Sequence, residues 1–269
     1  MTIGVLIESG VNSAYGGNYI KLVLPSGAIF EYPSEKDYSS SIGDIFEISN
    51  TGDISRKSYN SNVSGKFDSS KLTLNDDDIS QSISIIDVNE NGETITISKD
   101  RMDNVSLSND DILYAEFNEN GEITALILND VTGDLYDYGY LIDVDVKESD
   151  TLSSTTYEYD LNGVTQTKNY SHSNQGIKIG PVKLYLNSLN EYSFSNLSLI
   201  DEKVSSVNKN QLTFESGQKH TISDSVVVYK ETASTPVVVD INDIDLFDAE
   251  FYYDSTQSNG GAIRIIYIK

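Results

Sequence analysis

The chain repeats itself at its midpoint. The segment "YGYLID" at residues 138–143 matches "IGVLIE" at residues 3–8, and Gly139 takes the place of Gly4. Three further pairs of segments follow in the same order in the two halves: "IGDIFEISNTGDIS" with "IGPVKLYLNSLNEYS", "SKLTLNDDDISQSISIIDVN" with "NQLTFESGQKHTISDSVVVYKE", and "YAEFNENGEITALIL" with "DAEFYYDSTQSNGGAIRIIYI". A repeat of this kind is the signature of similar structural units placed in tandem. The sequence therefore predicts a first unit at residues 1–133 and a second at residues 134–269.

A shorter pattern recurs inside each half. "IGDIFEISNTGDIS" resembles "NDDILYAEFNENGEIT", because both have a polar entry, an alternating strand, a turn and a returning strand. The pattern predicts two modules in each unit, at about 1–60, 61–133, 134–197 and 198–269. Modules this small have thin cores, so we expect them to pack against their neighbours.

The strand patterns predict an all-β fold. "ETITISKD" alternates apolar and polar residues, as a half-buried strand does, whereas "ITALILND" and "GAIRIIYIK" have the longer apolar runs of fully covered strands. "NENG" at residues 118–121 predicts a type I′ hairpin turn. One helical turn is expected in "SLSNDDILYAEF", and no segment has the pattern of an amphipathic helix. The predicted fold is therefore tandem duplicated β-rich units, each made of two small barrel- or sandwich-like modules.

The charge of the chain limits its partners. It has 18 basic and 42 acidic residues, a net charge of −24, which repels nucleic acid phosphates and anionic lipids. Nucleic acid binding is therefore not expected. No segment approaches the length of an apolar membrane span, so membrane insertion is not expected either. The start, "MTIGVLIESG", does not have the pattern of a signal peptide. The chain is thus either cytoplasmic or a piece cut from a longer exported protein.

Residues for catalysis are few. The chain has no Cys, and its two histidines, His172 and His220, lie in polar, turn-like segments without a nucleophile motif nearby. Gly-rich phosphate loops are absent. Paired carboxylates leave glycoside hydrolysis open, although the chain has no Trp to form a sugar platform. We expect a protein that is not an enzyme and has no catalytic residues.

Calcium is the one ligand that the sequence suggests. In "DVNENG" the residues Asp87, Asn89 and Asn91 match the opening of an EF-hand loop. The position of the required Glu is occupied by Ser98, and the second copy has Lys230 where Asp87 stands in the first. A hairpin turn is the alternative interpretation of this segment. "NDDD" at residues 75–78 is a second candidate for an ion-binding loop, and no other cofactor is expected.

The second half carries a family resemblance. "VTGDLYDYGYLIDV", "GPVKLYLN", "NQLTFESGQKHTISDSVVVYK" and "AEFYYDSTQSNGGAIRIIYIK" follow one another in this order. They resemble the repeat region of bacterial, clostridial-type cell-surface proteins that carry S-layer homology (SLH) domains. The likeness is clearest over residues 131–269. The SLH anchor itself is missing, because no helical segment carries its Trp-Ala motif.

The resemblance implies a location and a role. It implies an extracellular, cell-wall or S-layer protein of a Gram-positive bacterium, with wall components, S-layer neighbours and glycans as the expected partners. The predicted function is a non-catalytic structural spacer. A carbohydrate-binding or adhesive module is the alternative, and a glycoside hydrolase is the third hypothesis.

Overall fold

The structure is a computed structural model that describes the whole chain except residues 13, 15, 59–61, 149–152, 172–175 and 187–190. About 57% of the chain is strand and 6% is helical. The chain forms two compact units, one of Met1–Leu135 with Ser258–Gly260 and one of Tyr136–Gln257 with Gly261–Lys269. The predicted all-β class with duplicated units is confirmed.

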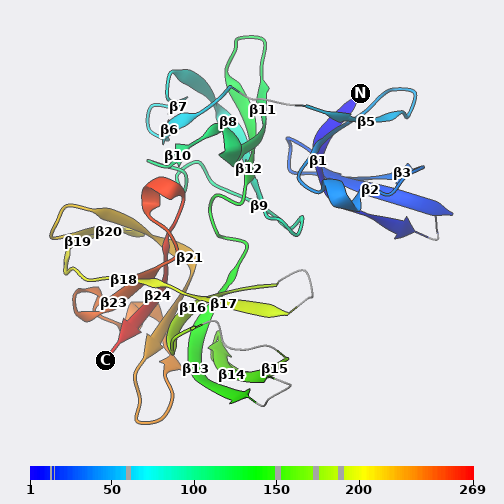
Figure 1. The fold of residues 1–269 in the computed structure, drawn as a ribbon. Helices are drawn as coiled ribbons and strands as arrows, with labels where there is room; N and C mark the ends of the chain where they lie inside the picture. The colour runs from blue at the N-terminus through cyan, green and yellow to red at the C-terminus, as the bar shows by residue number, and fades with distance from the viewer. Residues whose placement is uncertain (13, 15, 59–61, 149–152, 172–175, 187–190) are drawn as a thin grey trace. The chain divides into compact units, whose positions relative to one another are not determined.

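The first unit begins with a five-stranded antiparallel sheet in the order β3-β2-β1-β4-β5 (Figure 1). Its central strand β1 is paired on both sides, and Val5, Leu6 and Ile7 of this strand are buried. The short 3-10 helix η1 (Ser39–Ser41) lies between β3 and β4. The strands are β1 (Thr2–Asn12), β2 (Gly17–Val23), β3 (Ile29–Ser34), β4 (Ile45–Ile48) and β5 (Ile54–Lys57).

The first unit continues with a seven-stranded sheet in the order β10-β6-β7-β8-β12-β11, with β9 paired to β8. The pairing of β8 with β12 is parallel, and both strands are rich in buried Ile and Leu, as parallel strands covered on both faces are. The strands are β6 (Gly65–Asp68), β7 (Thr73–Leu74), β8 (Asp77–Val88), β9 (Thr94–Thr96), β10 (Ser106–Leu107), β11 (Ile112–Phe117) and β12 (Ile123–Asn129).

The second unit repeats this plan. Its five-stranded sheet has the order β15-β14-β13-β16-β17, which is the order of the first sheet with each strand replaced by its counterpart. Its seven-stranded sheet has the order β18-β23-β24-β21-β20-β19, with β22 paired to β21 and with β21 parallel to β24. The strands are β13 (Asp137–Glu148), β14 (Ser153–Leu161), β15 (Val164–Tyr170), β16 (Gly180–Leu186), β17 (Tyr192–Asn196), β18 (Ser198–Ile200), β19 (Val204–Asn208), β20 (Gln211–Phe214), β21 (Lys219–Lys230), β22 (Val237–Val238), β23 (Glu250–Tyr253) and β24 (Ile263–Ile268), with 3-10 helices η3 (Ile241–Asp243), η4 (Leu246–Asp248) and η5 (Gln257–Asn259).

The two repeated glycines have the same structural role. Gly4 lies in β1, where a Cβ would come within 2.6 Å of the carbonyl oxygen of Val23 on β2. Gly139 lies in β13, where a Cβ would come within 2.3 Å of the carbonyl oxygen of Asp160 on β14. In both strands a β-bulge follows between the second and the fourth residue after the glycine. A backbone contact this close explains why each copy begins with the same glycine.

The sheets of each unit are joined by different side chains. In the first unit the cluster that includes residues of both sheets is mainly aliphatic: Val5, Ile7, Val23, Ile45, Ile86, Val88, Tyr114 and Ile127. In the second unit the corresponding cluster is rich in tyrosine: Tyr138, Val227, Tyr229, Ile265 and Tyr267, with Tyr136, Tyr140, Leu197 and Tyr252 packed against it. Buried tyrosine hydroxyls need hydrogen-bond partners, and those of Tyr138 and Tyr229 donate to Asp254 and Asp160.

Of three local predictions, the type of one turn is wrong, one strand is present but shorter than its sequence pattern, and one helical turn is confirmed. The turn at residues 118–121 is not of type I′, because only Gly121 has a positive φ, of 83°, and its N–H donates to the carbonyl of Asn118. This is a type I turn followed by a left-handed glycine, a geometry that needs only one residue at positive φ. "ETITISKD" forms only the three-residue strand β9, because the chain turns at residues 98–104. The expected helical turn is present as η2 (Asn109–Asp111), with a capping box from Ser108.

Candidate functional site

Strand β8 carries a buried carboxylate near its end. Asp87 is 0% exposed. Its Oδ1 accepts a hydrogen bond from the backbone N–H of Val131 at 3.0 Å, and its Oδ2 accepts from the N–H and the Oγ1 of Thr132 at 2.7 and 2.6 Å. Hydrogen bonds to an ionised carboxylate are stronger than neutral ones. Asp87 therefore fixes the residues that follow β12, numbers 131–134, which we call the exit segment.

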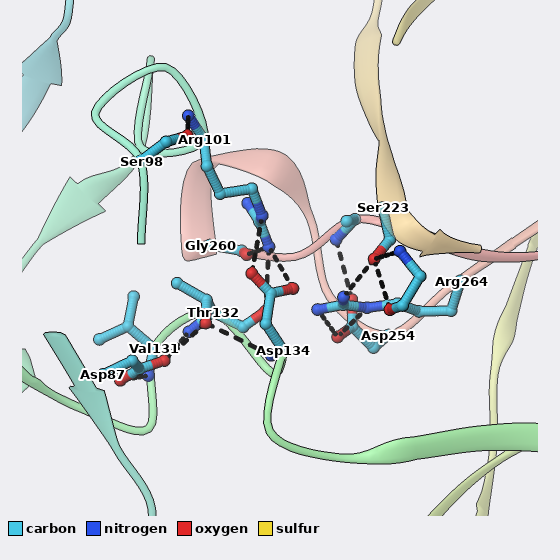
Figure 2. A network of polar contacts seen from close by, with 12 residues as sticks. Asp87, Ser98, Arg101, Val131, Thr132, Asp134, Ser223, Asp254, Gly260 and Arg264 are labelled. Atoms are coloured by element: carbon cyan, nitrogen blue, oxygen red, sulfur yellow. Dashed lines mark hydrogen bonds and ion pairs between the residues drawn. The ribbon is translucent and has the colours of Figure 1, made fainter. Parts of the chain in front are cut away.

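Arg101 holds the exit segment at a second place (Figure 2). Its Nε and Nη2 lie 3.2 and 3.4 Å from the carboxylate oxygens of Asp134, and Nη2 donates to the carbonyl oxygen of Thr132 at 3.0 Å. The same nitrogen donates at 2.5 Å to the carbonyl oxygen of Gly260, a residue of the first unit. The side chains of this ion pair are only 11% and 16% exposed. Salt in the solvent screens such a sheltered pair less than it screens a surface pair.

The second unit contains a fully buried ion pair. Arg264 on β24 is 0% exposed, and its Nε and Nη2 lie 2.9 and 2.8 Å from Oδ2 of Asp254. Its Nη1 donates to Oγ of Ser223 at 3.0 Å (Figure 2). The guanidinium carbon lies 4.7 Å from the ring centre of Tyr138, within the range of a cation–π contact. Burial of a charge is costly unless it is paired and hydrogen-bonded, and these contacts meet that condition.

Asp254 connects this pair to the start of the second unit. Its Oδ2 also accepts the hydroxyl of Tyr138 at 2.8 Å, and its Oδ1 accepts the N–H groups of Ser255 and Ala262 at 2.8 and 2.9 Å. Tyr138 stands at the beginning of β13. The first residues of the second unit are therefore bound to its buried ion pair.

A tyrosine–carboxylate pair joins the two sheets of the second unit. The hydroxyl of Tyr229 on β21 donates to Oδ1 of Asp160 on β14 at 2.8 Å, and the N–H of Gly163 donates to the same oxygen at 2.8 Å. Burial and the neighbouring carboxylate raise the pKa of Tyr229 far above its usual range, so its hydroxyl stays protonated as a donor. Both partners are buried, which makes the contact a structural one.

Two of the three predicted calcium ligands, Asp87 and Asn89, use their side-chain oxygens in hydrogen bonds within the chain. Asn89 lies in the turn between β8 and β9, where its Oδ1 accepts the N–H groups of Asn91 and Glu93 at 3.0 Å each. The turn at residues 118–121, which has the same letters "NENG", shows the same bonds around Asn118. Asp87 uses both of its oxygens on the exit segment instead. The hairpin-turn interpretation describes these residues, and calcium binding stays a prediction that these contacts do not support.

The second candidate ion-binding loop, residues 75–78, has a hydrogen bond between two of its own side chains. In "NDDD" the Nδ2 of Asn75 donates to Oδ2 of Asp76 at 3.3 Å. Among the residues that the structure describes, no group of three or more His, Cys, Asp or Glu side chains is placed to hold a metal ion. Nor does that part of the chain contain a helix with the length and apolar character of a membrane span.

His220 lies in an aromatic slot. It is 6% exposed, and its ring lies 5.7 Å from that of Phe214 and 5.2 Å from that of Tyr253, measured between centres. Within the described residues its Nδ1 has no hydrogen-bond partner. Burial lowers the pKa of His220, and the charge of Glu202 opposes this shift. His172 lies outside the described residues.

A surface hollow of about 410 Å³ in the second unit gathers carboxylates, lined by Leu199, Ile200, Asp201, Glu202, Lys203, Glu215, Ala249 and Glu250. Glu202 accepts the N–H of Ser216, and hydrogen bonding by the side chain and the backbone of Ser216 lowers the pKa of the Glu202 carboxyl. Glu250 pairs with Lys269 and accepts the hydroxyl of Tyr252. A glycosidase acid needs a raised pKa, so the direction of the shift at Glu202 is opposite to that requirement. The lining also lacks the aromatic rings on which sugars stack.

Sequence reasoning missed the buried arginines. Arg264 had a visible signal, because it is the one charged residue within the apolar run "AIRIIYI", and a charge in a covered strand implies a buried partner. Arg101 stands in a polar loop and had none. The sequence also compared Asp87 with Lys230. Lys230 is exposed at the end of β21, whereas Asp87 is buried in β8.

The fold and the contacts of the candidate site define a class of protein: a tandem all-β protein in which sheltered carboxylates and arginines bind other residues of the same chain. Comparisons with protein-family models, with curated proteins and with solved structures find no match.

Proposed function

We propose that the chain is a non-catalytic structural spacer of a secreted, cell-wall-associated S-layer-type surface protein. The observation that carries the proposal is that buried and partly buried carboxylates bind groups of their own chain. Asp87, Asp134 and Asp254 spend their carboxylate oxygens on backbone amides, on a hydroxyl or on an arginine of the same chain. A catalytic or binding site would present such groups to a substrate. Here they stabilise the backbone on both sides of the boundary between the two units.

The connector between the units supports a spacer role. Asp134 is bound within the first unit by Arg101, and Tyr138 is bound within the second unit by Asp254. Three residues, 135–137, lie between these two bound positions. Fully extended, they add only about 10 Å of chain. Tension along the polypeptide would therefore reach the folded units after very little extension, unlike the tension on a long Gly/Ser linker.

The charge of the chain fits an extracellular surface. A net charge of −24 keeps the protein strongly hydrated and discourages collapse onto neighbouring molecules. The likeness of residues 131–269 to the repeat region of SLH-domain proteins points to the same location. The partners proposed on this basis are wall components and S-layer neighbours, and glycans are the partner class of the competing adhesive hypothesis.

Two measurements test the proposal. First, the chain is inserted between a wall-anchoring domain and a reporter epitope on a Gram-positive cell, and we expect the epitope to become accessible to antibody-coated beads that do not reach it without the insert. An unstructured Gly/Ser insert of 269 residues is the control. Second, the isolated chain is tested on a glycan array with and without calcium. Saturable capture of one class of glycan would overturn the spacer function in favour of the adhesive one.

A further inference from the structure

We propose that the exit segment, together with Asp87 and Arg101, is a mechanical clamp that bears tension before β12 is pulled from its sheet. The biological use of a clamp rests on the proposed spacer function, but its existence is a property of the first unit alone. The clamp consists of the two contacts described above: Asp87 with residues 131 and 132, and Arg101 with Thr132 and Asp134.

The order of the contacts along the chain gives the order in which they bear tension. A pull applied beyond residue 135 reaches the ion pair of Asp134 with Arg101 first. The three hydrogen bonds of Asp87 come next, followed by the bond from the N–H of Asp130 to the carbonyl of Val88 at 2.8 Å. The parallel pairing of β12 with β8 follows these contacts, and its last pair is Asn129 with Val88. Strand β12 therefore cannot move along β8 from this end until both parts of the clamp have opened.

Burial makes the clamp costly to open. Asp87 is 0% exposed, and when Thr132 is drawn away its charge is left in the protein interior without two of its donors. Thr132 is buried as well, so its hydroxyl loses its acceptor in the same step. Exposed hydrogen bonds of a loop would exchange for bonds to water at little cost. The exit segment thus resists tension for a reason that an ordinary loop does not have.

The second unit differs at the corresponding place. The sequence comparison puts Lys230 where Asp87 stands in the first unit, and Lys230 is exposed at the end of β21. The residues at the end of β24 are held by the bond from the N–H of Glu231 to the carbonyl of Ile268 and by the exposed pair of Lys269 with Glu250. No carboxylate occupies the position from which Asp87 binds the exit segment. The clamp is therefore a feature of one copy and not of the repeat.

Single-molecule force measurements on the full chain test the clamp, and the absence of native cysteines allows handles to be attached through introduced ones. One handle is placed at Thr2→Cys. The other is placed either at Asp137→Cys, beyond the clamp, or at Asn129→Cys, before it. Pulling from residue 137 loads the exit segment, and pulling from residue 129 bypasses it. Each geometry is measured at constant force with and without Asp87→Asn.

We expect Asp87→Asn to raise the unfolding rate of the first unit by about tenfold or more when the handle is at residue 137, since it removes charge-assisted bonds. From residue 129 the change should be several times smaller. Asp111→Asn is the matched control, because the Oδ2 of Asp111 also accepts one backbone N–H and one hydroxyl, those of Ser108 at 2.7 Å each, outside the exit segment. Its effect should not depend on the handle position.

Equal effects of Asp87→Asn in the two geometries would overturn the clamp and leave Asp87 with an ordinary stabilising role. If Asp87→Asn does not fold, Thr132→Val, which removes one donor and keeps the carboxylate, is measured in the same two geometries and is judged by the same criterion. The outcome of the force measurement does not depend on the outcome of the glycan array. A sugar-binding chain can possess the clamp, and a spacer can lack it.

Discussion

Replacement of Arg264 by methionine should lower the free energy of unfolding of the second unit by more than the loss of an exposed ion pair does. The substitution keeps a long apolar stem on β24 and removes the charge that pairs with Asp254 at 2.8 Å in a site that is 0% exposed on the arginine side. Removing one partner of a buried ion pair costs about 3–5 kcal/mol. Asp254 retains three other donors, from Tyr138, Ser255 and Ala262, which places the expected loss at the lower end, about 3 kcal/mol.

The matched control is Arg56→Met in the first unit. Arg56 pairs with Asp44 at 2.7 Å, almost the same distance, but the side chain of Arg56 is 63% exposed. Exposed pairs contribute about 0–1 kcal/mol. The comparison therefore changes burial and leaves the residue type and the pair distance almost constant.

Urea denaturation followed by tyrosine fluorescence and by hydrogen exchange measures both variants, and the exchange data assign each transition to a unit. With a slope of about 2 kcal/mol per molar urea, Arg264→Met should lower the midpoint of the second unit by about 1.5 M. Arg56→Met should lower that of the first unit by less than about 0.5 M. If the two shifts are equal, the reasoning from burial is refuted.

Three further outcomes follow from single contacts. Because burial lowers the folded-state pKa of His220, the unfolded chain binds the proton more readily than the folded chain. The free energy of unfolding should therefore fall as the pH drops below about 6.5 and level off below the folded-state pKa. Urea midpoints measured between pH 7.5 and 5.5 should show this dependence in the wild-type chain and lose it in His220→Phe. Gly92→Ala should cost more than about 2 kcal/mol in thermal unfolding, because a Cβ would lie 1.8 Å from the carbonyl of Ile7, whereas Gly121→Ala, with a similar φ and open space, should cost about 1 kcal/mol. Tyr229→Phe should cost about 1–2 kcal/mol by the same assay, and a neutral result would mean that Asp160 finds another donor.

The backbone plan was predictable from sequence because local patterns determine it. Gly4 and Gly139 occupy strand positions where only glycine allows the neighbouring carbonyl to approach, so the repeat of the glycine marks the repeat of the strand. The apolar run of "GAIRIIYIK" reflects a strand that is covered on both faces, as β24 is. Glycine at a tight approach and continuous apolar runs are constraints that each residue meets within its own neighbourhood.

The candidate site was not predictable because its partners are distant in sequence. The residues that follow Asp87 predict a calcium ligand, but the donors that bind Asp87 are 44 and 45 residues further along the chain. The segment "NENG" looked like a ligand loop at residues 89–92 and like a turn at residues 118–121, although both form the same turn. A carboxylate next to a turn has the same local sequence whether it binds an ion or a distant backbone segment.

Duplication preserved the order of the five-stranded sheets and the parallel strand pair of the seven-stranded sheets, and it changed the way the polar groups of the units are used. Asp87 of the first copy binds the exit segment, whereas Tyr229 of the second copy joins two sheets through Asp160. Tyr229 belongs to the cluster between the sheets, which is rich in tyrosine in the second unit and mainly aliphatic in the first. A tyrosine fills that space and supplies one donor, whereas an aspartate there would be an unpaired buried charge. The role of a residue in one copy therefore cannot be transferred to its counterpart, because the packing that surrounds the position decides whether a charge is stable there.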